Sequence, residues 1–213
     1  MSIIKVSFNP HATSYYGEMN KAPTREEWLE LRRKGITGTD VAKIMGRSKW
    51  GKPLDVYKDK HGLSMPPQMN PAMVHGIEAE PRIINMYSKK NKVIVAQVGH
   101  LIHAEESWII GNPDGIVVNE KGDWIKGLEI KTGSNKKYWS STSDPEIYIP
   151  EEYMWQCRWY MALTQLSQWD VAVLLQNEEY RQYELYRDPV IEKEMLAKCR
   201  YFWFEKVCKK IEP

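Results

Sequence analysis

The spacing of apolar residues changes near residue 92, and this change constrains the fold more than any other feature of the chain. Residues 92–131 consist of short runs rich in β-branched and aromatic residues, separated by turn residues. Runs of this kind predict strands, and we expect all of them to lie in one sheet. The runs are KVIVAQVG (92–99), HLIHA (100–104), SWIIGNPDGIVVN (107–119) and DWIKGLEIK (123–131).

Helical patterns flank this segment on both sides. Thr24 and Glu27 have the spacing of a capping box, so we expect a helix to begin there and to stop at Gly35. Pro81 lies inside the long helical pattern at 71–91, where it predicts a kink or a helix start. Further helices are expected at 37–46, 52–62, 71–91, 150–166 and 189–213, further strands at 167–175 and 179–188, and loop at 1–22. This order predicts an α/β or α+β fold with one mixed sheet covered by helices.

Size and composition limit the classes of function. A chain of 213 residues suits a single domain, with a helical part over about 1–90 and the sheet in 91–213. The net charge of +2 does not by itself indicate nucleic acid binding. The three cysteines lack the spacing of a zinc site or a disulfide framework, and no run is apolar enough to cross a membrane. We expect a cytoplasmic protein with no membrane partner.

One group of residues in the β-rich segment could carry chemistry. Glu129 and Lys131 are two positions apart in a predicted strand, so both side chains point to one face and Ile130 points to the other, buried side. If the preceding run pairs antiparallel with this strand around the turn NEKGD, Asp114 lies close to Glu129. Two carboxylates and an ammonium group would then meet at the edge of the sheet.

This arrangement suits a magnesium ion. Mg²⁺ usually takes one or two carboxylates together with water and substrate phosphate, and the carbonyl of Ile130 offers another oxygen. Lys131 could orient the attacking water or offset charge that develops on a phosphoryl group. The alternative is ordinary, because acid-x-Lys on a strand is usually a solvated face and Asp114, which follows Pro113, could be a turn residue.

Four segments together resemble one family. PDG…EIK resembles the PD-(D/E)xK nuclease signature. The segment around RRKGITGTD resembles the N-terminal region of the lambda exonuclease / YqaJ-like viral recombinase family. HGIEAEPRI and YMWQCRWYMALT resemble its Gly-x-x-x-Glu and Tyr-x-x-Gln helices. Each motif is short, and the resemblance depends on their order across residues 25–165.

The resemblance implies a restriction-endonuclease-like core and a Mg²⁺-dependent 5′-to-3′ exonuclease acting on double-stranded DNA ends, with Mn²⁺ able to substitute. One strand would be degraded, and the other would remain as a 3′ overhang for phage-type single-strand annealing recombination. The resemblance also implies a ring-shaped homotrimer and a single-strand annealing protein as partner. The place of action would be the cytoplasm of a bacterial host.

The resemblance assigns the metal ligands and the catalytic residues. Asp114, Glu129 and the backbone carbonyl of Ile130 match the ligands, and Lys131 matches the catalytic lysine. Glu80 matches a helix acid that acts through water or a second metal.

Two of the helix assignments compete with neighbours or with plain structural roles. Glu78 is the competing candidate for Glu80, and only the spacing from Gly76 favours Glu80. Gln156 matches a helix glutamine near the site, but a polar residue at the edge of a core helix fits the same pattern. Tyr153 is typical of a core residue.

Four further residues match contacts that the family makes with DNA. Arg32 matches the arginine that grips the 5′-terminal phosphate, with Arg33 as the alternative. Thr39 lies at a predicted helix start, where hydroxyl and backbone N–H groups suit an anion, although a plain cap fits as well. Asn112 and Lys137 stand where a serine and an arginine are usual, so these two matches are less specific.

The long polar loop after residue 131 could also contact DNA. It places lysines beside Tyr138 and Trp139, a combination that suits phosphate contact and base stacking. A solvated loop with one aromatic anchor is the alternative.

Two other functions stay open. The chain could be a restriction-type or repair-type PD-(D/E)xK endonuclease, which would cut closed circles, although three cysteines argue against a Cas4-like iron–sulfur protein. It could also be a non-catalytic DNA-binding module with a decayed site. The presence of Asp114, Glu129 and Lys131 together argues against decay.

Overall fold

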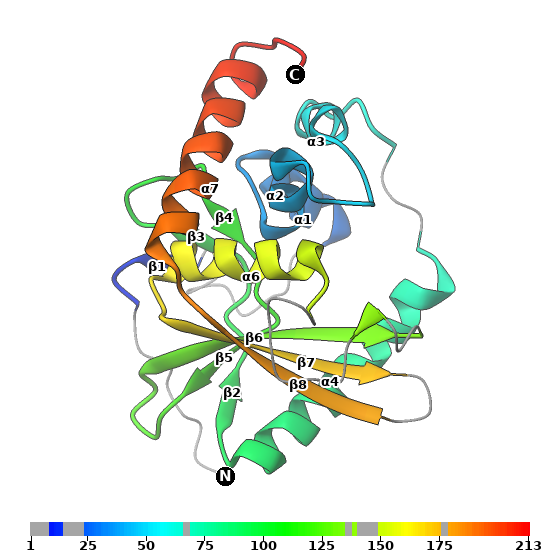
Figure 1. The fold of residues 1–213 in the computed structure, drawn as a ribbon, viewed down its shortest axis with the longest axis vertical. Coiled ribbons are helices and arrows are strands. Elements are labelled where there is room, and N and C mark those ends of the chain that lie inside the picture. Colours follow the sequence, from blue (N-terminus) through cyan, green and yellow to red (C-terminus); the bar gives the residue numbers. More distant parts are fainter. Residues whose placement is uncertain (1–8, 15–23, 66–68, 135–137, 140–148, 176–178) are drawn as a thin grey trace.

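A five-stranded mixed sheet forms the centre of the fold in a computed structural model, which describes residues 9–14, 24–65, 69–134, 138–139, 149–175 and 179–213 (Figure 1). The strand order is β2-β5-β6-β7-β8. β6 and β7 run parallel, and every other neighbouring pair in this sheet is antiparallel. The strands are β2 (Ile94–Ala96), β5 (Gly115–Val118), β6 (Trp124–Gly133), β7 (Gln168–Leu175) and β8 (Glu179–Tyr186).

A second, three-stranded sheet shows that the prediction of one sheet was wrong. Its antiparallel order is β1-β3-β4, formed by β1 (Ala12–Ser14), β3 (Leu101–His103) and β4 (Ile110–Gly111). The run 107–119 therefore contains two strands, β4 and β5, in different sheets. The break falls at Pro113, which has no N–H to donate to a strand ladder. The prediction of loop over residues 1–22 also missed β1.

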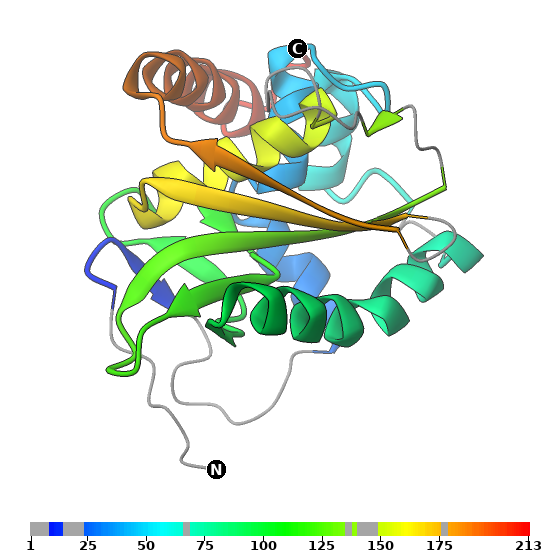
Figure 2. The same cartoon turned by 60° about the horizontal axis from the view of Figure 1, so that its bottom comes forward.

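Helices cover both faces of the large sheet (Figure 2). On one face lies α4 (Pro71–Asn91), which buries Ile83 and Tyr87 in a cluster with β5, β6 and β7. The opposite face is covered by α6 (Glu151–Thr164), with α2 and α7 packed near it. The other helices are α1 (Arg25–Arg33), α2 (Gly38–Met45), α3 (Pro53–Lys60) and α7 (Pro189–Tyr201), which continues into the π-helix η3 (Phe202–Val207).

Two helix ends agree with their predicted signals, whereas the helix predicted over 189–213 ends earlier, at Val207. The capping box of α1 is confirmed, because the Thr24 N–H donates to Glu27 at 2.7 Å and the Glu27 N–H donates to the Thr24 hydroxyl at 3.2 Å. Gly46 ends α2 in the left-handed conformation, with φ of 74°. Pro81 lies inside α4, so the alternative of a helix start there was wrong. Within the part of the chain that the structure describes, no helix is both long and apolar enough to cross a bilayer.

Two glycines allow close contacts, one between the neighbouring strands β6 and β7 and one between β4 and α6. A Cβ on Gly127 of β6 would lie 2.2 Å from the Trp169 ring of β7, and a Cβ on Gly111 of β4 would lie 2.6 Å from the Tyr160 ring of α6. The indole N–H of Trp159 donates to the carbonyl of Ile110 at 2.9 Å. α6 is therefore held tightly against the strands that flank the site described below.

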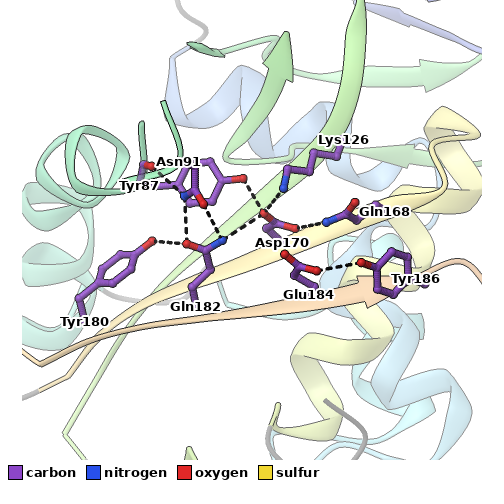
Figure 3. A network of polar contacts seen from close by, with 9 residues as sticks. All are labelled: Tyr87, Asn91, Lys126, Gln168, Asp170, Tyr180, Gln182, Glu184 and Tyr186. Atoms are coloured by element: carbon purple, nitrogen blue, oxygen red, sulfur yellow. Dashed lines mark hydrogen bonds and ion pairs between the residues drawn. The ribbon is translucent and has the colours of Figure 1, made fainter. Parts of the chain in front are cut away.

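A buried polar network ties α4 to the face of the sheet that it covers (Figure 3). Asp170 of β7 has no exposed surface, and its Oδ2 accepts from the Tyr87 hydroxyl and from Lys126 Nζ, both at 2.6 Å. Its Oδ1 accepts from Gln168 Nε2 at 2.8 Å. Burying the Asp170 carboxylate without these partners would lower the free energy of unfolding. The same contacts fix the C-terminal half of α4.

Candidate active site

β5 and β6 bring Asp114, Glu129 and Lys131 together, as predicted. Gly115 pairs with Leu128, which places Asp114 beside Glu129 at the end of the antiparallel ladder. Asp114 Oδ2 accepts a hydrogen bond from the Ile130 N–H at 2.7 Å. Lys131 Nζ forms an ion pair with Glu129 Oε1.

This strand face is not solvated, which excludes the ordinary interpretation of the acid-x-Lys pattern. The Glu129 side chain is 0% exposed, because α6 covers this side of β6. Its Oε2 atom is buried and receives no hydrogen bond from any residue that the structure describes. A buried carboxylate oxygen without a donor is costly unless a cation or a proton occupies it.

Burial changes the protonation of all three groups. Burial, together with the charge of Asp114, raises the pKa of Glu129 to about 8. Burial also raises the pKa of Asp114, although Lys131 and the Ile130 N–H act against this. Burial acts to lower the pKa of Lys131, but the charges of Glu129 and Asp114 outweigh it and raise that pKa. Lys131 therefore stays protonated, and Glu129 keeps its proton to a higher pH than an ordinary glutamate does.

The structure favours Glu80 over Glu78 as the helix acid. Glu80 is half-buried on α4 and accepts a hydrogen bond from Gln97 Nε2 at 3.3 Å. Burial and the nearby charge of Asp114 raise its pKa. Glu78 is exposed. Glu80 is therefore the helix acid that lies close enough to Asp114 for that charge to raise its pKa.

The donor set fits one hard divalent cation completed by water and substrate. No group of three His, Cys, Asp or Glu side chains in the described ranges forms a ready-made metal site. Mg²⁺ needs no such group, because it keeps several waters and binds through one or two carboxylates plus phosphate. Asp114 and the unpartnered Oε2 of Glu129 supply this minimum, and Glu80 lies within their electrostatic range.

Gln156 and Tyr153, both on α6, have different surroundings. Gln156 is buried and donates from Nε2 to the Tyr160 hydroxyl at 3.2 Å, which agrees with a polar residue at the edge of a core helix. The Tyr153 ring lies beneath Lys131, with Nζ 4.9 Å from its centroid, and stacks on Trp139 at 5.4 Å. The expectation of a plain core tyrosine missed this contact with the catalytic lysine candidate.

Arg32 and Thr39 lie side by side at the start of α2. Arg32 Nη2 donates to the Thr39 hydroxyl at 2.8 Å, and its guanidinium lies 4.6 Å from the centroid of the Trp28 ring. Arg33 instead pairs with Glu30 at 2.5 Å. The structure therefore favours Arg32 over Arg33 as the residue that faces the helix start.

Asn112 lies at the break between β4 and β5. Its Oδ1 is 3.0 Å from Nδ1 of buried His100, and its carbonyl accepts from the Tyr160 hydroxyl at 3.0 Å. No sequence motif indicated His100, whose pKa is lowered by burial. Lys137 lies outside the described residues, so its predicted contact with DNA stays a prediction.

A cavity of about 790 Å³ opens beside the site, between α4, the end of β6 and the loop after α2. Its lining includes Lys49, Trp50, Arg82 and Tyr138. Trp139 also lines it but is only 2% exposed, so the prediction that this residue stacks on bases was wrong.

Comparison with known proteins decides the family. The family model of the YqaJ-like viral recombinase domain matches residues 27–167, more than half of the chain. The chain belongs to the YqaJ-like viral recombinase family. This member is 31% identical over 195 residues to the uncharacterized protein YqaJ of Bacillus subtilis, covering 88% of this chain and 58% of that protein. It is 26% identical over 165 residues to the uncharacterized protein R354 of Acanthamoeba polyphaga mimivirus, covering 75% of this chain and 30% of that protein. The chain thus spans less than two-thirds of either relative.

Solved structures confirm the predicted fold class for this YqaJ-like chain. It matches the alkaline exonuclease LHK-Exo from Laribacter hongkongensis with a TM-score of 0.67 at 22% identity, over 88% of this chain and 94% of that one. It matches a phage-related exonuclease from Haemophilus somnus 129PT with a TM-score of 0.60 at 13% identity, over 83% and 96% of the two chains. The chain therefore shares the fold of these two exonuclease structures.

Proposed function

We propose that this YqaJ-like chain is a Mg²⁺-dependent exonuclease that degrades one strand of linear double-stranded DNA from its 5′ end and leaves a 3′ overhang. The observation that carries the proposal is the fully buried Glu129, which has one oxygen without a donor beside Asp114 and Lys131. The family and the fold support a nuclease. LHK-Exo has been solved in complex with dAMP, and we infer nucleotide products for this chain too.

Asp114, Glu129 and the carbonyl of Ile130 would hold Mg²⁺, or Mn²⁺ in its place, with Glu80 as an outer ligand. When bound, the cation polarises the scissile phosphate as a Lewis acid. Because the cation competes with the proton on Glu129, we expect binding to release that proton near neutral pH.

Lys131 acts as a fixed positive charge. Its raised pKa prevents it from accepting a proton, so it is no general base. Its ammonium can donate to a phosphate oxygen and offset the negative charge that develops during hydrolysis. The Tyr153 ring beneath it limits where the ammonium can lie. In this proposal Gln156 supports the site from α6 through Tyr160.

We place the 5′-terminal phosphate at Arg32 and the start of α2. The Thr39 hydroxyl takes only one of the five guanidinium donors of Arg32, and a phosphate can accept two others side by side. The first backbone N–H groups of α2 add donors to the same place. Asn112 and Lys137 would contribute further polar contacts. This pocket would make the enzyme favour 5′-phosphorylated ends and would set the polarity of degradation.

The remaining elements of the proposal depend on the family resemblance alone. We infer that the whole chain is one nuclease domain, that three copies form a ring around the duplex, and that a single-strand annealing protein receives the overhang. We also infer that it acts in the cytoplasm of a bacterial host.

One assay tests the reaction. Purified protein is incubated with Mg²⁺ and either a linear duplex labelled on one 5′ end or the same sequence as a closed circle. We expect rapid release of the 5′ label from the linear duplex and an intact circle. Cleavage of the circle would support a restriction-type endonuclease instead, and an intact linear duplex would support a non-catalytic DNA-binding module.

The pocket needs a separate comparison. We expect Arg32→Ala to lose the preference for 5′-phosphate over 5′-hydroxyl ends, whereas Arg33→Ala, on the same helix, keeps it. An unchanged preference in Arg32→Ala would contradict the assignment of the pocket.

A further inference from the structure

A closed ring of polar contacts connects the proposed phosphate pocket to a buried ion pair. Arg32 donates to the Thr39 hydroxyl at 2.8 Å, which lies 3.2 Å from the Thr37 hydroxyl. Thr37 donates to Asp40 Oδ2 from its hydroxyl at 2.7 Å and from its backbone N–H at 2.9 Å. Lys60 Nζ closes the ring, because it donates to Asp40 Oδ2 at 2.6 Å and to the Arg32 carbonyl at 2.8 Å.

Lys60 is an unusual residue in this ring. It ends α3, where a lysine would normally reach solvent, yet its side chain is 0% exposed and its carboxylate partner is 4% exposed. It is the member that joins three segments of the chain: the end of α1, the start of α2 and the end of α3. Breaking one side of such a buried pair leaves an uncompensated charge.

The charge of this pair matters for a neighbouring anion. Asp40 lies in the first turn of α2, the place proposed for the 5′-phosphate, and its negative charge would repel that group. Although burial acts to raise the pKa of Asp40, the charges of Lys60 and Arg32 hold it at about 2, so Asp40 stays ionised. Burial lowers the pKa of Lys60, against the opposing effect of the Asp40 charge. In its ammonium form, 2.6 Å away, Lys60 balances the charge of Asp40.

We propose that Lys60 and Asp40 are positioning residues for recognition of the DNA 5′-phosphate. Asp40 holds Thr37 at the helix start through an oxygen acceptor, which an Asn side chain also offers. Lys60 acts mainly by cancelling the charge of Asp40, and its bond to the Arg32 carbonyl contributes less. The two residues touch the pocket's side chains and backbone, not the DNA. This inference rests on the proposed function, because it takes the pocket at Arg32 and Thr39 as given.

The test measures discrimination between DNA ends. The ratio of kcat/KM for 5′-phosphate over 5′-hydroxyl duplexes is determined for wild type, Lys60→Met, and the double variant Asp40→Asn/Lys60→Met. Coulomb's law at an effective dielectric constant of about 20 gives roughly a tenfold or larger change in an equilibrium for one uncompensated unit charge within about 10 Å of another. We therefore expect Lys60→Met to lower the ratio by about tenfold or more, and the electrically neutral double variant to recover most of it.

The outcomes separate the inference from the proposed function. Equal rates on the two ends by wild type would reject the pocket itself, and the inference with it. A wild-type preference that survives Lys60→Met, or a double variant that discriminates as poorly as Lys60→Met, would reject the inference alone. If Lys60→Met does not fold, Asp40→Asn replaces it, because this variant leaves no buried carboxylate. We expect its ratio to stay at or above that of wild type, and a fall would overturn the inference.

The chain offers a matched control in a second buried ion pair. Lys126 lies 2.6 Å from the fully buried Asp170 in the network on the opposite face of the sheet (Figure 3). Lys126→Met also removes the cationic partner of a buried carboxylate, that of Asp170, and so lowers stability. It leaves the phosphate pocket at Arg32 unchanged. We expect it to keep the wild-type ratio, and loss of the ratio in both lysine variants would show that general destabilisation, not the ring, controls discrimination.

Discussion

The buried carboxyl of Glu129 makes the stability of the metal-free protein depend on pH. Its pKa is raised from 4.5 to about 8 by burial and by Asp114. Between these values the folded protein holds a proton that the unfolded chain releases, so the free energy of unfolding falls as pH rises. One proton corresponds to about 1.4 kcal/mol per pH unit, which over this interval gives at most about 5 kcal/mol. Asp114, whose pKa is also raised, acts with the same sign.

Glu129→Gln removes the ionisable group and keeps its size. We expect the metal-free variant to unfold at nearly the same urea concentration as wild type at pH 5, and to be more stable by up to about 5 kcal/mol at pH 9. Urea unfolding in EDTA, followed by tryptophan fluorescence at pH 5, 7 and 9, measures this difference. Glu120→Gln, at an exposed turn, is the matched control and should follow wild type.

Added metal should reverse the order of stability. The proposed ligands of Mg²⁺ are the ionised carboxylates of Asp114 and Glu129, so added Mg²⁺ should stabilise wild type more at pH 9 than at pH 6. It should have little effect on the stability of Glu129→Gln. Parallel pH profiles for wild type and Glu129→Gln in EDTA would refute the conclusion that Glu129 is protonated in the folded, metal-free protein.

Three further substitutions test the role of Lys131, the contact between β6 and β7, and the hydrogen bonds of Asp170. We expect Lys131→Met to lower kcat by about 10²-fold or more while Mg²⁺ still raises the melting temperature, because the lysine offsets charge and does not hold the metal; unchanged kcat would contradict this role. Gly127→Val should lower the free energy of unfolding by about 3 kcal/mol, because a Cβ there lies 2.2 Å from the Trp169 ring, and normal urea unfolding would contradict the close packing of β6 on β7. Tyr87→Phe should cost about 1–3 kcal/mol, because buried Asp170 loses a hydrogen bond, and urea unfolding measures this as well.

The sequence allowed the main contacts of the site to be predicted. The strand–turn–strand pattern sets the register of β5 and β6, and the period of two along β6 places Glu129 and Lys131 on one face. Both signals depend only on residues that are close in sequence, so they can be recognised without knowledge of the rest of the fold. The same holds for the capping box at Thr24 and for Gly46 at the end of α2.

Burial and long-range partners could not be predicted in the same way. Glu129 is fully buried because α6, which begins more than twenty residues later, covers its strand. Lys60 looks like an ordinary helix-surface lysine, and only the packing of α3 against α1 and α2 buries it. The division of the run 107–119 between two sheets was missed because both halves are apolar. Pro113 was the local signal that could have indicated the break.

The most direct test of the central claim is release of nucleotides from a linear, 5′-phosphorylated duplex by wild type and by Asp114→Asn, each in Mg²⁺ and in EDTA. Asp114 is the residue to change, because its carboxylate is a proposed ligand and also anchors the Ile130 N–H at 2.7 Å. We expect wild type to release nucleotides only with Mg²⁺. We expect Asp114→Asn, shown to be folded by circular dichroism, to release almost none. Release by wild type in EDTA, or by Asp114→Asn at the wild-type rate, would contradict the central claim.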